Sequence, residues 1–126
     1  EYLTVMDLAP TFIEIAGAHY PDDGSVVPML GESAKGLLAG VTTNIHDDDY
    51  VTAAYNAGRA YLRQGNWKIA NLEAPFDEAD FELFDLSADP GESTNLAEDE
   101  PEKYAALIDL WRVERWRLGI VLPQDL

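Results

Sequence analysis

Apolar and polar positions divide the chain into an apolar helix, an irregular connector, a run of short strands and a final amphipathic helix. Residues 7–17 predict the first helix, because Asp7 can cap its free N–H groups and Gly17 suits a left-handed stop. An apolar stripe recurs there at helical spacing, formed by Leu8, Phe12, Ile15 and Ala16. Other apolar residues lie off this stripe, so the helix needs cover on more than one side.

Prolines and glycines interrupt the pattern between residues 19 and 49, which indicates a long connector. Within it, residues 33–39 can form one or two helical turns with Leu37 and Leu38 buried.

Strand composition follows the connector in four segments: residues 50–56, 59–63, 67–72 and 81–86. The turn residues Gln64-Gly65-Asn66 join the second and third segments into a hairpin. After the fourth, Asp89-Pro90-Gly91 places proline and glycine where a type II turn needs them, so we expect the sheet to end there.

Residues 99–118 predict the longest helix, with Asp99 and Glu102 as a capping-box-like start and arginines near its C-terminal end. Its apolar residues recur at helical spacing: Tyr104, Leu107, Ile108, Trp111 and Leu118. We expect Trp67, Trp111 and Trp116 to serve packing in or beside the core. The order of elements predicts an α+β fold, in which a small antiparallel sheet of about four strands packs against a long C-terminal helix, plus one N-terminal helix.

Composition narrows the possible partners. The 126 residues contain 8 Lys plus Arg against 24 Asp plus Glu, a formal charge of -16, which disfavours binding to nucleic acid and to anionic membrane surfaces. No apolar run reaches the ~18 residues that a membrane-spanning helix needs. The absence of cysteine excludes a disulfide framework, a zinc-thiolate site and a thiol nucleophile from these residues.

The densest set of oxygen ligands is His46-Asp47-Asp48-Asp49, a composition that suits calcium or magnesium. Contiguous residues cannot all point at one ion, so a solvated loop is the favoured interpretation. His19 lies in a turn-like stretch and is expected to be a surface or packing histidine and not a catalytic one. No serine lies in a Gly-x-Ser-x-Gly elbow, so the residues show no nucleophilic site.

Arg59, Arg63 and Lys68 stand out because the chain has few cations and they lie together on the predicted hairpin. On a strand Arg59 and Arg63 share one face with Tyr61, where two arginines could grip an anion. The favoured interpretation is that these cations pair with the abundant carboxylates of the surface.

Three segments together resemble the C-terminal region of sulfatases, particularly bacterial arylsulfatases of the alkaline-phosphatase superfamily. They are Met6-Asp7-Leu8-Ala9-Pro10-Thr11, the stretch from Gly58 to Lys68 with Gly65-Asn66-Trp67-Lys68, and Phe81 to Leu86 followed by Asp89-Pro90-Gly91-Glu92 and Asn95-Leu96. Their order and spacing cover nearly the whole chain.

The resemblance implies a parent enzyme that hydrolyses sulfate esters with a formylglycine, made from Cys or Ser, beside a bound calcium. The nucleophile motif Cys/Ser-x-Pro-x-Arg is absent from these residues, so no catalytic residue and no metal ligand can be transferred, and the chain alone is expected to be inactive. Only Arg59, Arg63 and His46 remain as candidates for contact with an anion or the substrate cleft.

The resemblance also implies a division of the chain into two parts. Residues 1–40 would be the last helix and connector of the large sulfatase domain, and residues 41–126 the C-terminal subdomain. The expected partner is the upstream catalytic domain of the same chain, or a second copy bound through the helix at 7–17. The residues leave the compartment open, and the resemblance to bacterial arylsulfatases implies a bacterial periplasm or cytoplasm.

Two alternatives stay open. A relative acting on phosphate mono- or diesters would share the scaffold. A non-enzymatic interaction module would use the arginine face or the apolar helix to bind a partner.

Overall fold

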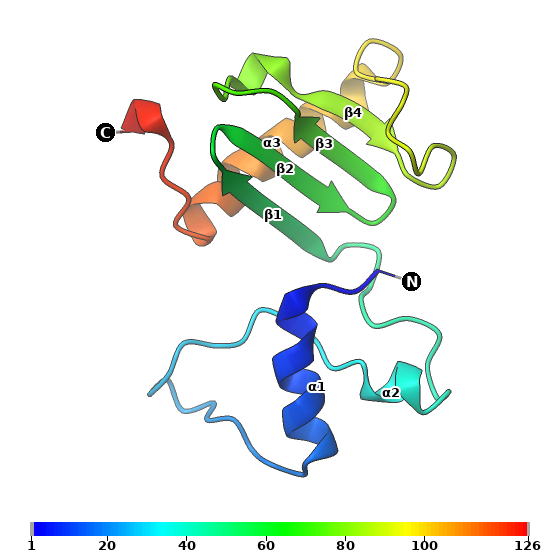
Figure 1. The fold of residues 1–126 in the computed structure, drawn as a ribbon, viewed down its shortest axis with the longest axis vertical. Helices are drawn as coiled ribbons and strands as arrows, with labels where there is room; N and C mark the ends of the chain where they lie inside the picture. The colour runs from blue at the N-terminus through cyan, green and yellow to red at the C-terminus, as the bar shows by residue number, and fades with distance from the viewer. Residues whose placement is uncertain (1, 126) are drawn as a thin grey trace. The chain divides into compact units, whose positions relative to one another are not determined.

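The structure is a computed structural model that describes residues 2–125, and the chain forms two compact units, Glu1–Asp47 and Asp48–Leu126. Figure 1 shows the helical first unit and the second unit, which contains the sheet. The α+β fold class with four antiparallel strands, a long C-terminal helix and an N-terminal helix is confirmed. None of the described helices is long and apolar enough to span a membrane.

The first unit contains a 3-10 turn η1 (Val5–Asp7), helix α1 (Leu8–Ile15) and the short helix α2 (Lys35–Leu38). Gly17 follows α1 with a φ of 65°, which confirms the predicted left-handed stop. Asp7 makes no side-chain capping hydrogen bond to α1, so its predicted capping role is wrong. Leu38 is 71% exposed, so the prediction that it is buried is also wrong.

The second unit is built on strands β1 (Val51–Asn56), β2 (Arg59–Gln64), β3 (Trp67–Asn71) and β4 (Glu82–Asp85), in the order β1-β2-β3-β4. All neighbouring strands are antiparallel, and the turn at residues 64–67 joins β2 to β3 as predicted. Another 3-10 turn, η2 (Glu78–Asp80), precedes β4, and η3 (Pro123–Asp125) lies near the end of the chain.

Helix α3 (Pro101–Arg117) covers one face of the sheet, against β1 and β3 (Figure 1). The side chains between the helix and the sheet form the core, because alternate strand residues point to this face. The buried residues of this core include Leu62, Ile69, Leu83, Leu107 and Trp111. Phe76 and Phe81 pack with Trp111 at ring-centroid distances of 5.9 and 5.4 Å.

Three local predictions in this unit are wrong. Helix α3 begins at Pro101, and its N-cap is Glu100 instead of Asp99, with no side-chain capping hydrogen bond. At the turn where Asp89 accepts from Glu92 N–H, the left-handed residue is Glu92, with a φ of 54°, and not Gly91, so the turn is not type II. Trp116 is 73% exposed, since it lies on the face of α3 away from the sheet.

Candidate functional site

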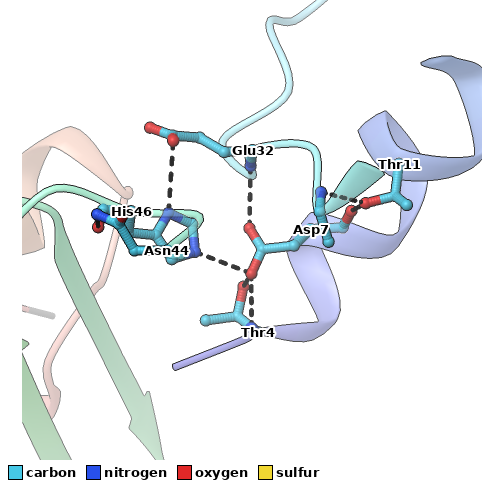
Figure 2. Close-up of polar contacts among 7 residues, drawn as sticks. Thr4, Asp7, Thr11, Glu32, Asn44 and His46 are labelled. Atoms are coloured by element: carbon cyan, nitrogen blue, oxygen red, sulfur yellow. Dashed lines mark hydrogen bonds and ion pairs between the residues drawn. The ribbon is translucent and has the colours of Figure 1, made fainter. Parts of the chain in front are cut away.

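Asp7, at the start of α1, is the centre of the buried polar cluster of the first unit (Figure 2). Its carboxylate is 0% exposed and accepts hydrogen bonds from the Thr4 N–H at 2.6 Å and the Thr4 hydroxyl at 3.0 Å. It also accepts from the Glu32 N–H at 2.9 Å and lies 3.0 Å from His46 Nε2. One carboxylate therefore joins three segments that are far apart in the sequence.

These donors explain how a carboxylate stays ionised where water is excluded. Burial alone would raise the pKa of Asp7, but hydrogen bonds from the Thr4 and Glu32 N–H groups, from His46 and from the Thr4 hydroxyl outweigh it. The net result is a pKa below its ordinary value. The cluster thus holds a negative charge that stabilises the bonds converging on it.

The same turn of helix also fixes the connector through Thr11. The Thr11 hydroxyl donates to the Asp7 carbonyl oxygen at 2.6 Å and accepts from the Ala34 N–H at 2.8 Å. Gly31 lies so close to η1 that a Cβ there would overlap with the Met6 carbonyl oxygen. The connector is therefore held against η1 at residues 31 and 32 and against α1 at residue 34.

His46 is a buried member of this cluster. Its side chain is 6% exposed, with Nε2 at Asp7 and Nδ1 at 3.7 Å from a Glu32 carboxylate oxygen. Asp47, Asp48 and Asp49 are exposed, and residues 2–125 contain no group of three or more His, Asp or Glu side chains placed to hold a metal ion. The contacts of His46 with Asp7 and Glu32 indicate a structural role, in which His46 helps to hold the connector against the start of α1.

Arg59 and Arg63 lie in the second unit, on the face of the sheet opposite α3. We call this surface the cationic face; the register places Lys68 beside Arg63 on it, and Tyr61 between the two arginines. A cavity of about 320 Å³ opens there, lined by residues of β1, β2, β3 and their turns, among them Arg59 and Lys68. Arg63 is not part of the lining, so the structure brings only one of the two arginines to the cavity.

The cations of this face differ in their partners. Lys68 Nζ lies 2.6 Å from Glu92 and 5.6 Å from the centre of the Tyr61 ring. Arg63 donates from Nε to the Gly65 carbonyl oxygen. Arg59 donates from Nε to the Leu72 carbonyl oxygen at 2.9 Å, and within residues 2–125 its two terminal nitrogens meet no carboxylate. The expected pairing with surface carboxylates is therefore seen for Lys68 but not for Arg59.

Sequence reasoning missed the roles of Thr4, Thr11 and Glu32. A usable signal was present, because Thr4-Val5-Met6-Asp7 has the spacing of a capping box, in which an acidic side chain three residues on reaches back to the first N–H group. No local pattern links Glu32 or Thr11 to this cluster, since both contacts depend on how the connector crosses the helix.

Several sulfatases are similar to this chain, although no protein-family model matches it. An uncharacterized sulfatase of Schizosaccharomyces pombe is 30% identical over 130 residues, which cover 99% of this chain and 23% of that protein. Arylsulfatase K of Xenopus laevis is 34% identical, over 80% of this chain and 20% of its own length. Choline-sulfatase of Rhizobium meliloti is 31% identical, over 75% of this chain and 17% of its own length. The chain thus spans at most about a quarter of the length of these curated relatives.

Solved structures share the fold. Ps i-CgsB, in complex with k-i-k-neocarrahexaose, gives a TM-score of 0.61 at 20% identity, covering 87% of this chain and 23% of that one. A protein solved with its substrate D-glucosamine-2-N,6-O-disulfate gives a TM-score of 0.59 at 23% identity, covering 86% of this chain and 23% of that one. Together with the curated relatives, these matches confirm the resemblance to a sulfatase region.

Sulfatases imply a calcium ion and a formylglycine, and the residues present do not fit either group. The sequence has no cysteine and no Ser-x-Pro-x-Arg segment from which a formylglycine could form. The buried Asp7 carboxylate faces four donors, and a cation would need those lone pairs.

Proposed function

We propose that this chain is the C-terminal region of a sulfuric ester hydrolase and that it supports and shapes the substrate cleft. The observation that carries the proposal is similarity to a sulfatase across 99% of the chain but only 23% of the relative's length. In this proposal residues 1–40 are the last helix and connector of the catalytic domain, and residues 41–126 are a subdomain beside it. In this proposal the nucleophile and the calcium ligands are supplied by the upstream catalytic domain and not by residues 1–126.

Helix α1 supplies the surface through which such a region would attach. Its apolar side chains are exposed within this chain, including Phe12 at 64% and Ile15 at 56%, while Thr11 faces the connector. Burying one such side chain stabilises an interface by about 1.5–3 kcal/mol. The proposed cover is the upstream catalytic domain, and in the isolated chain a second copy takes its place.

Activity measurements test the enzymatic part of the proposal. The purified chain should not hydrolyse an aryl sulfate above the buffer rate, whereas the protein that includes its catalytic domain should do so in a calcium-dependent reaction. Turnover by the chain alone that survives chelation and scales with its concentration would contradict the proposal. Hydrolysis of an aryl phosphate but not an aryl sulfate by the longer protein would instead favour a phosphate-ester hydrolase.

Sedimentation of the isolated chain tests the attachment surface. We expect a concentration-dependent dimer that the double substitution Phe12→Ser, Ile15→Ser converts to monomer. The matched control is Val113→Ser, which changes an apolar side chain that is 62% exposed on α3. A wild-type monomer with α1 fully protected from hydrogen exchange would show that the apolar face needs no cover.

A further inference from the structure

We propose that the cavity on the cationic face is a binding site for an oxyanionic group on a sugar-sized ligand, with Arg59 as the residue that contacts the anion. The cavity has a volume of about 320 Å³ and lies between β1, β2, β3 and the turns that join or follow them. All of its lining residues belong to the second unit, whereas the Asp7 cluster belongs to the first.

Because the chain is strongly acidic, the lack of a carboxylate partner for Arg59 among the described residues is unexpected. With 24 carboxylates against 8 lysines and arginines, an arginine side chain has many potential partners. The three arginines of α3 all use them, and their ion pairs are Arg112 with Glu78 and Asp109, Arg115 with Asp125, and Arg117 with Glu114. Within residues 2–125, Arg59 forms no such pair, so the terminal nitrogens of its guanidinium are available to a ligand.

The local structure holds Arg59 in place at the edge of the cavity. Its Nε donates to the Leu72 carbonyl oxygen, which fixes the plane of the guanidinium and leaves the two terminal nitrogens as donors. That pair of nitrogens is suited to the two oxygens of a sulfate, phosphate or carboxylate group. Lys68 adds a second cation to the lining, although it shares its charge with Glu92.

The turn beside Arg59 is itself anchored. The Asn71 side-chain amide is oriented so that both its oxygen and its nitrogen have hydrogen-bond partners. In this orientation the nitrogen donates to the Gly58 carbonyl oxygen at 3.2 Å and to the Glu73 carbonyl oxygen at 2.8 Å. A Cβ at Gly58 would lie 2.8 Å from that of Ala74. The β1–β2 turn and the segment after β3 are therefore packed together at one end of the cavity.

The lining leaves room for a ring. Ala54, Ala57 and Ala70 present only methyl groups to the cavity, and Tyr61 contributes an aromatic ring. Ala57 and Gly58 have φ values of 50° and 80°, the pair of left-handed residues that a two-residue hairpin turn between Asn56 and Arg59 requires, so this turn is fixed beside the cavity. A volume of about 320 Å³ is at the lower end of the range for small-molecule sites, which fits one sugar-sized ring better than a longer ligand.

The shared chemistry of the ligand is an oxyanion on a ring, and it could come from a sulfated or a carboxylated sugar. We favour the sulfated sugar, a choice that rests on the proposed sulfatase function; the anion site itself does not. Binding to the chain can be measured without turnover, so failure of this inference and failure of the proposed function are distinguishable.

The test is a titration of the whole 126-residue chain followed by amide chemical-shift NMR, with a glucose monosulfate, glucuronate, glucose and inorganic sulfate as probes. We expect saturable shifts at residues 54–61 and 68–72 with the glucose monosulfate, weaker shifts with glucuronate and none with glucose. Arg59→Gln should weaken the binding by about tenfold or more, because it removes a charge-assisted contact.

Three variants separate binding from changes in fold. Arg117→Gln removes an exposed arginine that is already paired, and it should leave the affinity within about twofold. Arg59→Lys keeps the charge but not the paired donors, so its affinity for the glucose monosulfate should lie between that of Arg59→Gln and that of the wild type. Ala54→Leu fills the cavity without changing charge, and it should weaken the sugar sulfate more than inorganic sulfate.

The inference is overturned if the glucose monosulfate produces no saturable shift on the cationic face, or if Arg59→Gln binds as tightly as Arg117→Gln. Equal binding of glucose and its sulfate would also overturn it. A preference for glucuronate over the monosulfate would retain the anion site and reject the sulfated sugar. With that outcome, the proposed sulfatase function would still be tested separately by the activity measurements described above.

Discussion

Replacing Asp7 by asparagine should destabilise the first unit by about 3 kcal/mol, as the hydrogen bonds around the carboxylate indicate. Three donors converge on Oδ2, and the Glu32 N–H is bound to Oδ1. An asparagine amide can offer its oxygen to only one of these positions. With the oxygen at the Oδ2 position, its NH2 group faces the Glu32 N–H, and a buried donor left without an acceptor costs about 1–3 kcal/mol.

The remaining bonds also weaken in the asparagine variant. Hydrogen bonds to a charged group contribute roughly twice as much as neutral ones, so the three donors at Oδ2 lose up to about 1 kcal/mol each. The lower part of each range applies, because the hydrogen bonds from Thr4 and Glu32 to the carboxylate are only partly buried. Together the two effects give the estimate of about 3 kcal/mol.

Native-state hydrogen exchange is the appropriate assay, because the cluster stabilises one unit and not the whole chain. The amides of Glu32 and Ala34 should exchange about 100-fold faster in Asp7→Asn than in the wild type at neutral pH. Asp47→Asn is the matched control, since Asp47 is exposed and adjacent to His46. Protection of both amides within about threefold of the control would refute the reasoning from these hydrogen bonds.

The dependence on pH follows from the direction of the pKa shift. The pKa of Asp7 is lower in the folded chain than its ordinary value of 3.8, because the hydrogen bonds from Thr4, Glu32 and His46 outweigh the opposing effect of burial. Its contribution to stability is therefore fully present above about pH 3.8 and is lost as the pH falls through the folded pKa. The difference between wild type and Asp7→Asn should be largest at neutral pH and should shrink in acid.

Two further pairs of substitutions test the packing. Trp111→Ala should lower the free energy of unfolding of the second unit by about 3–5 kcal/mol in chemical denaturation, because Trp111 is fully buried. The control Trp116→Ala should change this free energy by less than about 0.5 kcal/mol, because Trp116 is exposed. Equal effects of the two substitutions would contradict the assigned core. Gly31→Ala should speed amide exchange in residues 32–34 by displacing the connector from η1. The control Gly91→Ala, where a Cβ meets only an Asp89 oxygen at 3.6 Å, should leave the spectrum of the first unit unchanged. Unchanged exchange in residues 32–34 of Gly31→Ala would show that the close approach is not a constraint.

Much of the second unit could be predicted from the sequence because its signals are local. Alternation in β2 places Ala60 and Leu62 on the buried face and the arginines on the other, as the register confirms. The tight turns need only neighbouring residues, and α3 carries its own apolar spacing. Capping and turn type were less predictable, because Asp99 and Gly91 suit those roles chemically but the backbone adopts other geometries there.

The candidate sites were harder to predict because they depend on contacts between distant segments. The arrangement of His46 against Asp7 spans 39 positions and follows from the path of the connector, which has no periodic pattern. Likewise, the sequence placed Arg59 and Arg63 on one face, but it could not show that Leu72 positions Arg59 at the cavity while Arg63 binds Gly65. Side-chain chemistry was visible in the sequence, and side-chain partners were not.

The strand order of the sheet has a consequence for how the second unit is made. Each strand pairs with its immediate successor, so all three pairings close short loops and can form quickly as the polypeptide leaves the ribosome. The helix that shields Leu62, Ile69 and Leu83 is synthesised after the last strand. Until it arrives, a nascent sheet presents a bare apolar surface, and transiently exposed surface of this kind is prone to aggregation during synthesis.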